Sequence, residues 1–246
     1  MKLVLVAAVT GALVFSLKME AQMEPAETVA AGCGCISPVF VTSNTNGGWS
    51  NGGYYVHNNM WNASTGETLY ACTCSNWYVT ATYPGTTDVK TYPNVHKDIH
   101  PGVPLDHYHT ITSTFAATAP RTGIYDVAYD IWLNGVGWGG ATELMIWTEN
   151  HKQVPLGRIH AQVTFDGMTY NAWHYQGRGA NVITLVPEHV MTSGKLDLKA
   201  MFDWAIGKVW MPANSTVNQI CFGVEICSTE NRPATFCFTD FSVTMN

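Results

Sequence analysis

Short segments of alternating apolar and polar residues follow one another along most of the chain, separated by turns rich in Gly, Pro, Asn and Asp. Alternation with a period of two is typical of β-strands. One segment, from Leu196 to Ile206, has helical periodicity instead, and we expect Thr192 or Ser193 to cap its start and Gly207 to end it. The apolar face of that helix consists of Leu198, Met201, Phe202 and Ala205. Many short strands, one late helix and an even composition predict a single all-β domain, a β-sandwich or jelly roll.

Residue parity separates core positions from the other face of a sheet, because successive residues of a strand point to opposite sides. In the segments 124–134, 142–148 and 219–227, one alternate set is largely apolar and the opposite set contains carboxylates. In the segment 55–61, one alternate set is both aromatic and hydrogen-bonding. The residues on these non-core faces include His57, Asn59, Trp61, Asp126, Asp130, Trp132, Glu143, Met145, Trp147 and Glu225.

Carboxylates, amides and flat aromatic rings on one face are the groups that recognise a sugar polymer. Pyranose rings stack their apolar C–H faces on Trp and Tyr, and their hydroxyl groups need carboxylate and amide partners. One strand of this kind is common on the solvent side of a sheet, but repetition in four segments favours a sugar-binding face. Parity by itself does not establish catalysis.

Composition and charge narrow the class of partner. Hydrophobic residues make up 46% of the 246 residues and charged residues only 12%, which excludes a disordered chain and an Arg/Lys-rich surface. The 12 basic and 18 acidic residues leave a net charge of -6, which disfavours nucleic acid and anionic membranes. We therefore expect a neutral partner, neither nucleic acid nor membrane.

The N-terminal segment has the pattern of a secretory signal peptide. A basic start at Lys2 precedes a mostly apolar run from Leu3 to Leu17, which is short for a membrane span. We expect cleavage after Ala21; cleavage after Ala31 and an uncleaved anchoring helix are the alternatives. The predicted divisions are a signal peptide at 1–21, a short acidic leader at 22–31 and one domain at 32–246. The protein is thus predicted to be secreted and extracellular.

Seven cysteines agree with export, because an oxidising compartment favours their pairing. Each of two C-x-C pairs would present both thiols on one face of a strand, so we expect a double disulfide rung between Cys33/Cys35 and Cys72/Cys74. A four-thiolate zinc site is the alternative, but C-x-C is tighter than the usual C-x2-C spacing. One thiol is expected to stay unpaired among Cys221, Cys227 and Cys237.

A histidine-rich stretch raises the question of a metal site. His107 and His109 would place two imidazoles on one face if they lay on a strand, as some metal sites require. Pro101 and Pro104 favour a polar loop instead, and we expect no metal and no cofactor. The sequence contains neither a Walker-type phosphate loop nor a G-x-S-x-G nucleophile elbow.

Five segments carry a resemblance to a known family. They are N-N-M-W at 58–61, V-K-T-Y-P-N at 89–94, Y-D-I at 129–131, E-L-M-I-W at 143–147 and F-G-V-E at 222–225. Their order and spacing resemble those of glycoside hydrolase family 12, the endo-β-1,4-glucanases and xyloglucanases. The resemblance covers about residues 54 to 246 and implies a β-jelly roll of two curved antiparallel sheets around an open substrate cleft.

The resemblance also implies roles for three carboxyl groups. Hydrolysis with retention needs two carboxyl groups about 5 to 5.5 Å apart, one to attack the anomeric carbon and one to protonate the departing oxygen. By position, Glu143 would be the nucleophile and Glu225 the general acid and then base. Asp130 would hydrogen-bond the nucleophile and help to set which group holds a proton.

The remaining site residues would bind substrate. By the resemblance, Asn59 and Trp61 hold a glucose unit on the non-reducing side, and Met145 lines the floor. The non-core face residues His57, Trp132 and Trp147 complete the predicted set. The expected function is a secreted, monomeric, cofactor-free endo-hydrolase of β-1,4-glucans such as cellulose, mixed-linkage β-glucan or xyloglucan.

Departures from the family pattern define the alternative. Val224 and Ile226 flank Glu225 where the family usually has Thr and Pro, and Thr142 stands where a tyrosine is often found. These changes indicate a drifted cleft lining, and the alternative is a glucan-binding or recognition protein that has lost turnover. Retention of all three carboxylates favours the enzyme.

Overall fold

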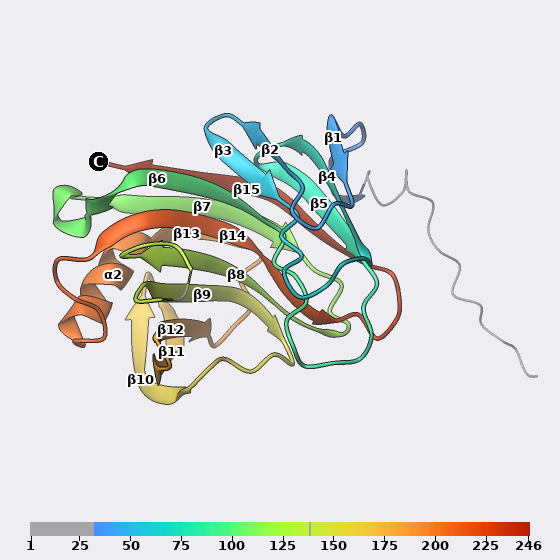
Figure 1. Ribbon diagram of the computed structural model, residues 1–246. Coiled ribbons are helices and arrows are strands. Elements are labelled where there is room, and N and C mark those ends of the chain that lie inside the picture. Colours follow the sequence, from blue (N-terminus) through green and yellow to red (C-terminus); the bar gives the residue numbers. More distant parts are fainter. Residues whose placement is uncertain (1–31, 138) are drawn as a thin grey trace, which may run out of the picture.

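Alternating apolar residues build two β-sheets in the computed structural model, which describes residues 32–137 and 139–246 (Figure 1). The six-stranded sheet has the order β1 (Phe40–Thr42), β4 (Glu67–Thr73), β5 (Asn76–Ala81), β15 (Ala234–Met245), β7 (Ile111–Thr118) and β13 (Ser193–Asp197). The nine-stranded sheet has the order β10 (Arg158–Phe165), β11 (Met168–Gly177), β12 (Ala180–Pro187), β9 (Thr142–His151), β8 (Ile124–Leu133), β14 (Thr216–Ser228), β6 (Asn94–Pro104), β3 (Tyr54–His57) and β2 (Gly48–Asn51). The predicted signal peptide and leader lie outside the described residues.

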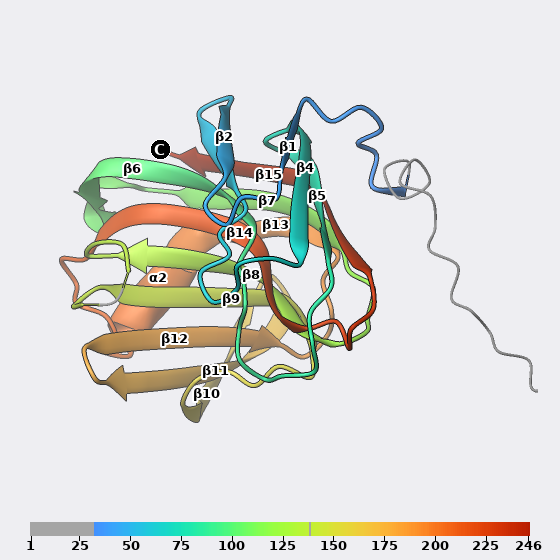
Figure 2. The same ribbon diagram turned by 45° about the vertical axis from the view of Figure 1, so that its right-hand side comes forward.

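Strand pairing is antiparallel in both sheets except between β12 and β9, which run parallel. The β10–β11–β12 meander brings its third strand back beside β9, and this return makes the pair parallel. Figure 2 shows β14, β8, β9, β12 and β11 as successive strands of the larger sheet. The fold is the predicted all-β sandwich, and β12–β9 is the one parallel ladder among the described strands.

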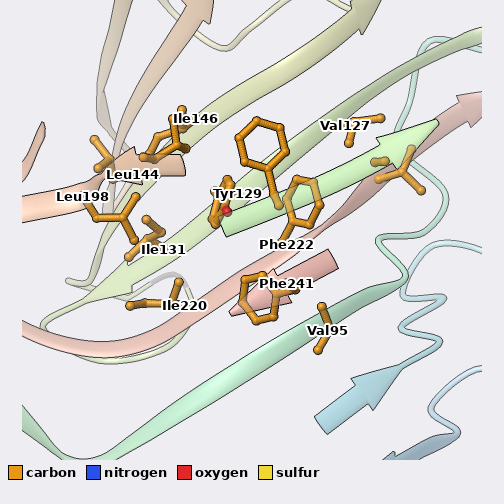
Figure 3. Close-up of a cluster of buried hydrophobic side chains, with 14 of the residues drawn as sticks. Val95, Val127, Tyr129, Ile131, Leu144, Ile146, Leu198, Ile220, Phe222 and Phe241 are labelled. Carbon is orange, nitrogen blue, oxygen red and sulfur yellow. The ribbon is translucent and has the colours of Figure 1, made fainter. Parts of the chain in front are cut away.

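The core lies between the two sheets and confirms the parity of β8. Tyr129 on β8 packs against Phe222 on β14 with ring centroids 4.7 Å apart, and Phe222 stacks with Phe241 of the opposite sheet at 6.1 Å (Figure 3). Val127 and Ile131, on the same face of β8, are also buried. Each such buried side chain contributes about 1.5–3 kcal/mol, and together they hold the even-numbered residues of β8 on the opposite face.

The predicted helix is α2 (Leu198–Gly207), and a short 3₁₀ helix, η1 (Leu105–His107), precedes β7. All four residues of the expected apolar face of α2 are buried. The predicted cap is wrong: Asp197 caps the helix, its carboxylate accepting a hydrogen bond from Ala200 N at 3.0 Å. Ser193 instead begins β13, which stays paired with β7 up to Asp197 and so delays the start of the helix.

The disulfides agree with the prediction in one of two rungs. Cys35 pairs with Cys72 as expected, but Cys33 pairs with Cys237, and Cys74 is free. The reason is that β4 ends at Thr73 after a register shift, so Cys74 lies in the following turn and does not share a face with Cys72. Cys221 and Cys227 are both free and buried, so the three late cysteines leave two thiols unpaired rather than one.

Two further expectations concern metals and membranes. His107 belongs to η1 and His109 follows it, so the pair does not lie on a strand. Within 32–137 and 139–246, no three His, Cys, Asp or Glu side chains are arranged to hold a metal ion. Within the same ranges, no helix has the length and apolar character needed to cross a membrane.

Candidate active site

The predicted carboxyl groups come from three adjacent strands of the larger sheet, β9, β8 and β14, on the face opposite the core. Glu143 on β9 lies opposite Trp132 on β8, and the next residue on that face, Met145, lies opposite Asp130. Glu143 and Glu225 are partly exposed, whereas Asp130 is 8% exposed. Parity therefore places all three predicted carboxylates on one face, with both glutamates partly buried and partly exposed.

Glu225 differs from an ordinary surface glutamate in its proton affinity. Burial and then the negative charge of Glu143 raise the pKa of Glu225 to about 7. Both causes act in the same direction, because a low dielectric and a neighbouring anion each disfavour the ionised form. Glu225 thus keeps its proton up to neutral pH, as a general acid requires.

Asp130 is the buried carboxyl beside Glu143. Burial, followed by the charges of Glu143 and Glu225, raises its pKa well above the usual range. Its Oδ2 accepts a hydrogen bond from the indole Nε1 of Trp132 at 3.1 Å, which orients the carboxyl group. Trp132, predicted to bind substrate, therefore also holds Asp130 in place.

Two of the predicted substrate-binding residues form a closed floor. Met145 is 6% exposed and Trp147 is 2% exposed, and they pack with Ala128 and the half-buried Val186. Trp147 is thus placed on the predicted face, but its ring is covered and offers little stacking surface.

The segment predicted to bind a glucose unit is not a strand throughout. β3 ends at His57, and Asn59 has a φ of 42°, so the alternation assumed over 55–61 does not continue as a strand. The chain turns here because Asn58 N bonds to Gly47 O and Met60 N to Thr45 O, outside the sheet.

The side chains of this segment are nevertheless available. Trp61 is 61% exposed, which leaves its ring open for stacking. Asn59 Nδ2 donates to Tyr92 O at 3.3 Å, leaving its carbonyl oxygen for a ligand. His57, half-buried, shares a 2.8 Å hydrogen bond with Asn46. β6 alone separates this strand from the Glu225 strand, β14.

A buried glutamate, Glu67, is linked by hydrogen bonds to the segment that contains Asn58 and Asn59. Thr91 Oγ1 lies 2.9 Å from Glu67 Oε1 and 3.2 Å from Asn58 O, and Tyr83 OH donates to the other oxygen of Glu67. Glu67 is 4% exposed, and burial raises its pKa to about 8 despite these hydrogen bonds. The group is therefore protonated in the folded state near neutral pH.

The raised pKa of Glu67 predicts a pH-dependent stability. The folded state binds this proton more tightly than the unfolded state, whose pKa is near 4.5, so stability falls as pH rises from about 4.5 to about 8. The loss from this group is roughly 4 kcal/mol over that range. We expect Glu67→Gln, which stays neutral, to remove most of this slope. Urea unfolding at both pH values measures it, with exposed Glu188→Gln as the control; an unchanged slope in Glu67→Gln would contradict the assignment.

Two residues of the site were missed by the sequence reasoning. Asp126, 0% exposed, lies directly opposite Glu225 in the β8–β14 ladder. Tyr92, 4% exposed, donates its hydroxyl to Ala128 O at 3.0 Å, and burial and the surrounding acids raise its pKa. Parity had already put Asp126 on the correct face, but nothing in the sequence identified its partner strand.

The model of glycosyl hydrolase family 12 matches residues 52–246. The chain belongs to glycosyl hydrolase family 12. The five motifs that resembled the family all lie within the matched range.

The proteins that this chain resembles are distant from it in sequence, and a solved structure among them is similar in fold. Endoglucanase S of Pectobacterium parmentieri is 27% identical over 208 residues, covering 72% of this chain and 77% of that protein. The protein named inactive glycoside hydrolase XLP1, of Phytophthora nicotianae (strain INRA-310), is 24% identical over 200 residues, covering 75% and 84%.

A solved structure is similar in fold. The xyloglucanase domain of NopAA, a type three effector from Sinorhizobium fredii, was solved in complex with cellobiose. Its structure matches that of this chain with a TM-score of 0.75 and 28% sequence identity, covering 85% of this chain and 100% of that chain. The likeness confirms the predicted jelly roll.

Proposed function

We propose that this member of family 12 is a secreted endo-hydrolase of β-1,4-glucans that acts with retention of configuration. The observation that carries the proposal is the pairing of two partly exposed glutamates, of which Glu225 has its pKa raised to about 7 by burial and by the charge of Glu143. Retaining hydrolysis needs this division, with one carboxylate to attack and one carboxylic acid to donate.

In the first step, the Glu143 carboxylate attacks the anomeric carbon while Glu225 gives its proton to the departing glycosidic oxygen. The product is a glycosyl–enzyme ester at Glu143. In the second step, Glu225, now ionised, takes a proton from a water molecule that attacks the same carbon and releases Glu143. Asp130 lies beside the nucleophile and is held in place by the hydrogen bond from Trp132. Its raised pKa favours the protonated form, so Asp130 does not add a second negative charge next to Glu143.

Substrate recognition rests on the open end of the same face. Trp61 offers an exposed ring to the apolar face of a pyranose, and Asn59 offers an amide oxygen to a hydroxyl. The name of Endoglucanase S and the cellobiose bound to the NopAA domain support a β-glucan substrate. Two disulfides support secretion, because such bonds persist in oxidising compartments.

The second candidate is a glucan-binding protein without turnover. It is motivated by the relative named as inactive and by Val224 and Ile226, which flank Glu225 where the family usually has Thr and Pro. A binding protein has no need for an acid of raised pKa beside a second carboxylate, so the carboxyl pair favours the enzyme.

The test is release of reducing sugar from barley β-glucan, carboxymethyl cellulose and xyloglucan by the purified protein. We expect release from at least one polymer, and the ranking of the three names the substrate. NMR of the first product should show the β-anomer, since two displacements restore the starting configuration. An initial α-anomer would refute the retaining mechanism, and binding of all three polymers without release would support the glucan-binding protein.

A further inference from the structure

Asp126 is the most deeply buried acid of the site and has no role in the mechanism described above. It lies on β8, directly opposite Glu225 in the β8–β14 ladder, and is 0% exposed. Neither of its oxygens accepts a hydrogen bond from an N–H or hydroxyl group of the described residues. Its side chain instead makes a hydrogen-bonding contact with the carboxyl group of Glu225.

This environment decides the protonation state of Asp126. An ionised carboxylate that is fully buried and receives no hydrogen bond is strongly unfavourable, so the group remains neutral. The titratable groups that face it are Glu225 and Cys227 on β14, Asp130 on the same strand, Glu143 on β9, and Tyr92 before β6. These groups carry either no charge or a negative charge, so none of them stabilises an anion at Asp126. Burial and the neighbouring acids accordingly raise the pKa of Asp126 well above its usual range.

A neutral carboxyl group has one O–H to donate, and an acceptor lies in contact with it. We propose that Asp126 is a positioning residue for the acid and base steps, permanently protonated and donating its O–H to the carboxyl group of Glu225. The proposal rests on the function proposed above and adds a residue to it. Asp126 does not touch the substrate in this role and acts only through Glu225.

The proposed hydrogen bond has a defined effect on each step. Before reaction, Glu225 holds its own proton and accepts the O–H of Asp126. After Glu225 has given its proton to the departing oxygen, the same O–H stabilises the carboxylate that remains. Glu225 then takes a proton from the attacking water and returns to its starting form, while Asp126 keeps its proton throughout. The hydrogen bond therefore opposes burial and holds the pKa of Glu225 lower than burial alone would set it.

Two substitutions separate this role from others. Asp126→Asn is neutral at every pH and still donates an N–H to Glu225, whereas Asp126→Ala donates nothing. We expect Asp126→Asn to keep the alkaline limb of the kcat/KM profile at its wild-type pH. Asp126→Ala should move that limb upward by about one to two pH units, since Glu225 loses a hydrogen bond to its charged form. Asp166→Asn, in an exposed turn, is the matched control.

A second readout does not depend on turnover. Carbon-13 NMR of glutamate side-chain carboxyls, with the Glu225 signal assigned by Glu225→Gln, follows the pKa of Glu225 in each variant. The same order is expected: wild type and Asp126→Asn alike, Asp126→Ala raised. If Asp126→Ala does not fold, Asp126→Leu replaces it, because leucine has nearly the shape of aspartate and no donor.

Two outcomes would overturn the proposal. An unchanged Glu225 pKa in Asp126→Ala would show that no hydrogen bond is donated and that Asp126 only fills space. A lowered Glu225 pKa in Asp126→Asn would show that wild-type Asp126 is either an anion or donates no hydrogen bond to Glu225, since loss of a negative charge and gain of a donor both have that sign. Failure of the proposed function is distinguished from both, because it appears as a wild type that releases no sugar while the NMR titration is still measurable.

Discussion

Glu143→Ala is expected to lower the hydrolysis of β-1,4-glucan by on the order of 10⁴-fold or more while oligosaccharide binding stays within a few-fold. The reason is that the other carboxyl groups described on this face cannot take over the attack: Asp126 and Asp130 are buried with raised pKa values, and Glu225 holds the proton that the departing oxygen needs. The measurement is kcat on the best polymer substrate, together with calorimetric binding of a cello-oligosaccharide.

Two comparisons make this result specific to a nucleophile. Glu188→Ala removes an exposed glutamate that directly follows β12 and should leave kcat unchanged. Sodium azide should partly restore turnover in Glu143→Ala, because a small anion can approach the anomeric carbon from the side vacated by the carboxylate. A Glu143→Ala enzyme that hydrolyses polymer at a rate comparable to wild type would refute the assignment of Glu143.

The second large effect concerns the Cys33–Cys237 disulfide, which joins the first described residues to the last strand. It closes a loop with a sequence separation of 204 residues, against 37 for Cys35–Cys72. The loop-entropy relation gives roughly 5 kcal/mol for the longer loop and about 4 kcal/mol for the shorter. We expect Cys33→Ala/Cys237→Ala to lower the free energy of unfolding by more than Cys35→Ala/Cys72→Ala does, as measured in urea.

The free thiol of Cys74 supplies the control for this comparison. Cys74 is half-buried and unpaired, so Cys74→Ala removes a thiol without opening a loop and should change the free energy of unfolding by less than about 1 kcal/mol. If the Cys33/Cys237 variant loses no more stability than Cys74→Ala, the disulfide does not constrain the unfolded chain.

The local alternation of apolar and polar residues was sufficient to predict which face a side chain lies on, wherever a strand or helix is regular. The two-residue period of β8, β9 and β14 is a property of each strand alone, so the sequence predicted that Asp130, Glu143 and Glu225 would avoid the core. The apolar face of α2 was predicted for the same reason. The same alternation gave wrong predictions at the ends of strands. β3 stops before Asn59, where the backbone bonds to Gly47 and Thr45 outside the ladder, and β4 stops before Cys74, where the chain turns into β5.

By itself, the sequence determined the family, the all-β class and the face on which each carboxylate lies, since these follow from motifs and from a period set by neighbouring residues. Only the tertiary structure decided that Cys237 pairs with Cys33, that Trp147 is covered and that Asp126 meets Glu225. Strand register brings together residues far apart in the chain. Burial then sets the proton affinity of each acid, and both depend on how the whole sheet packs.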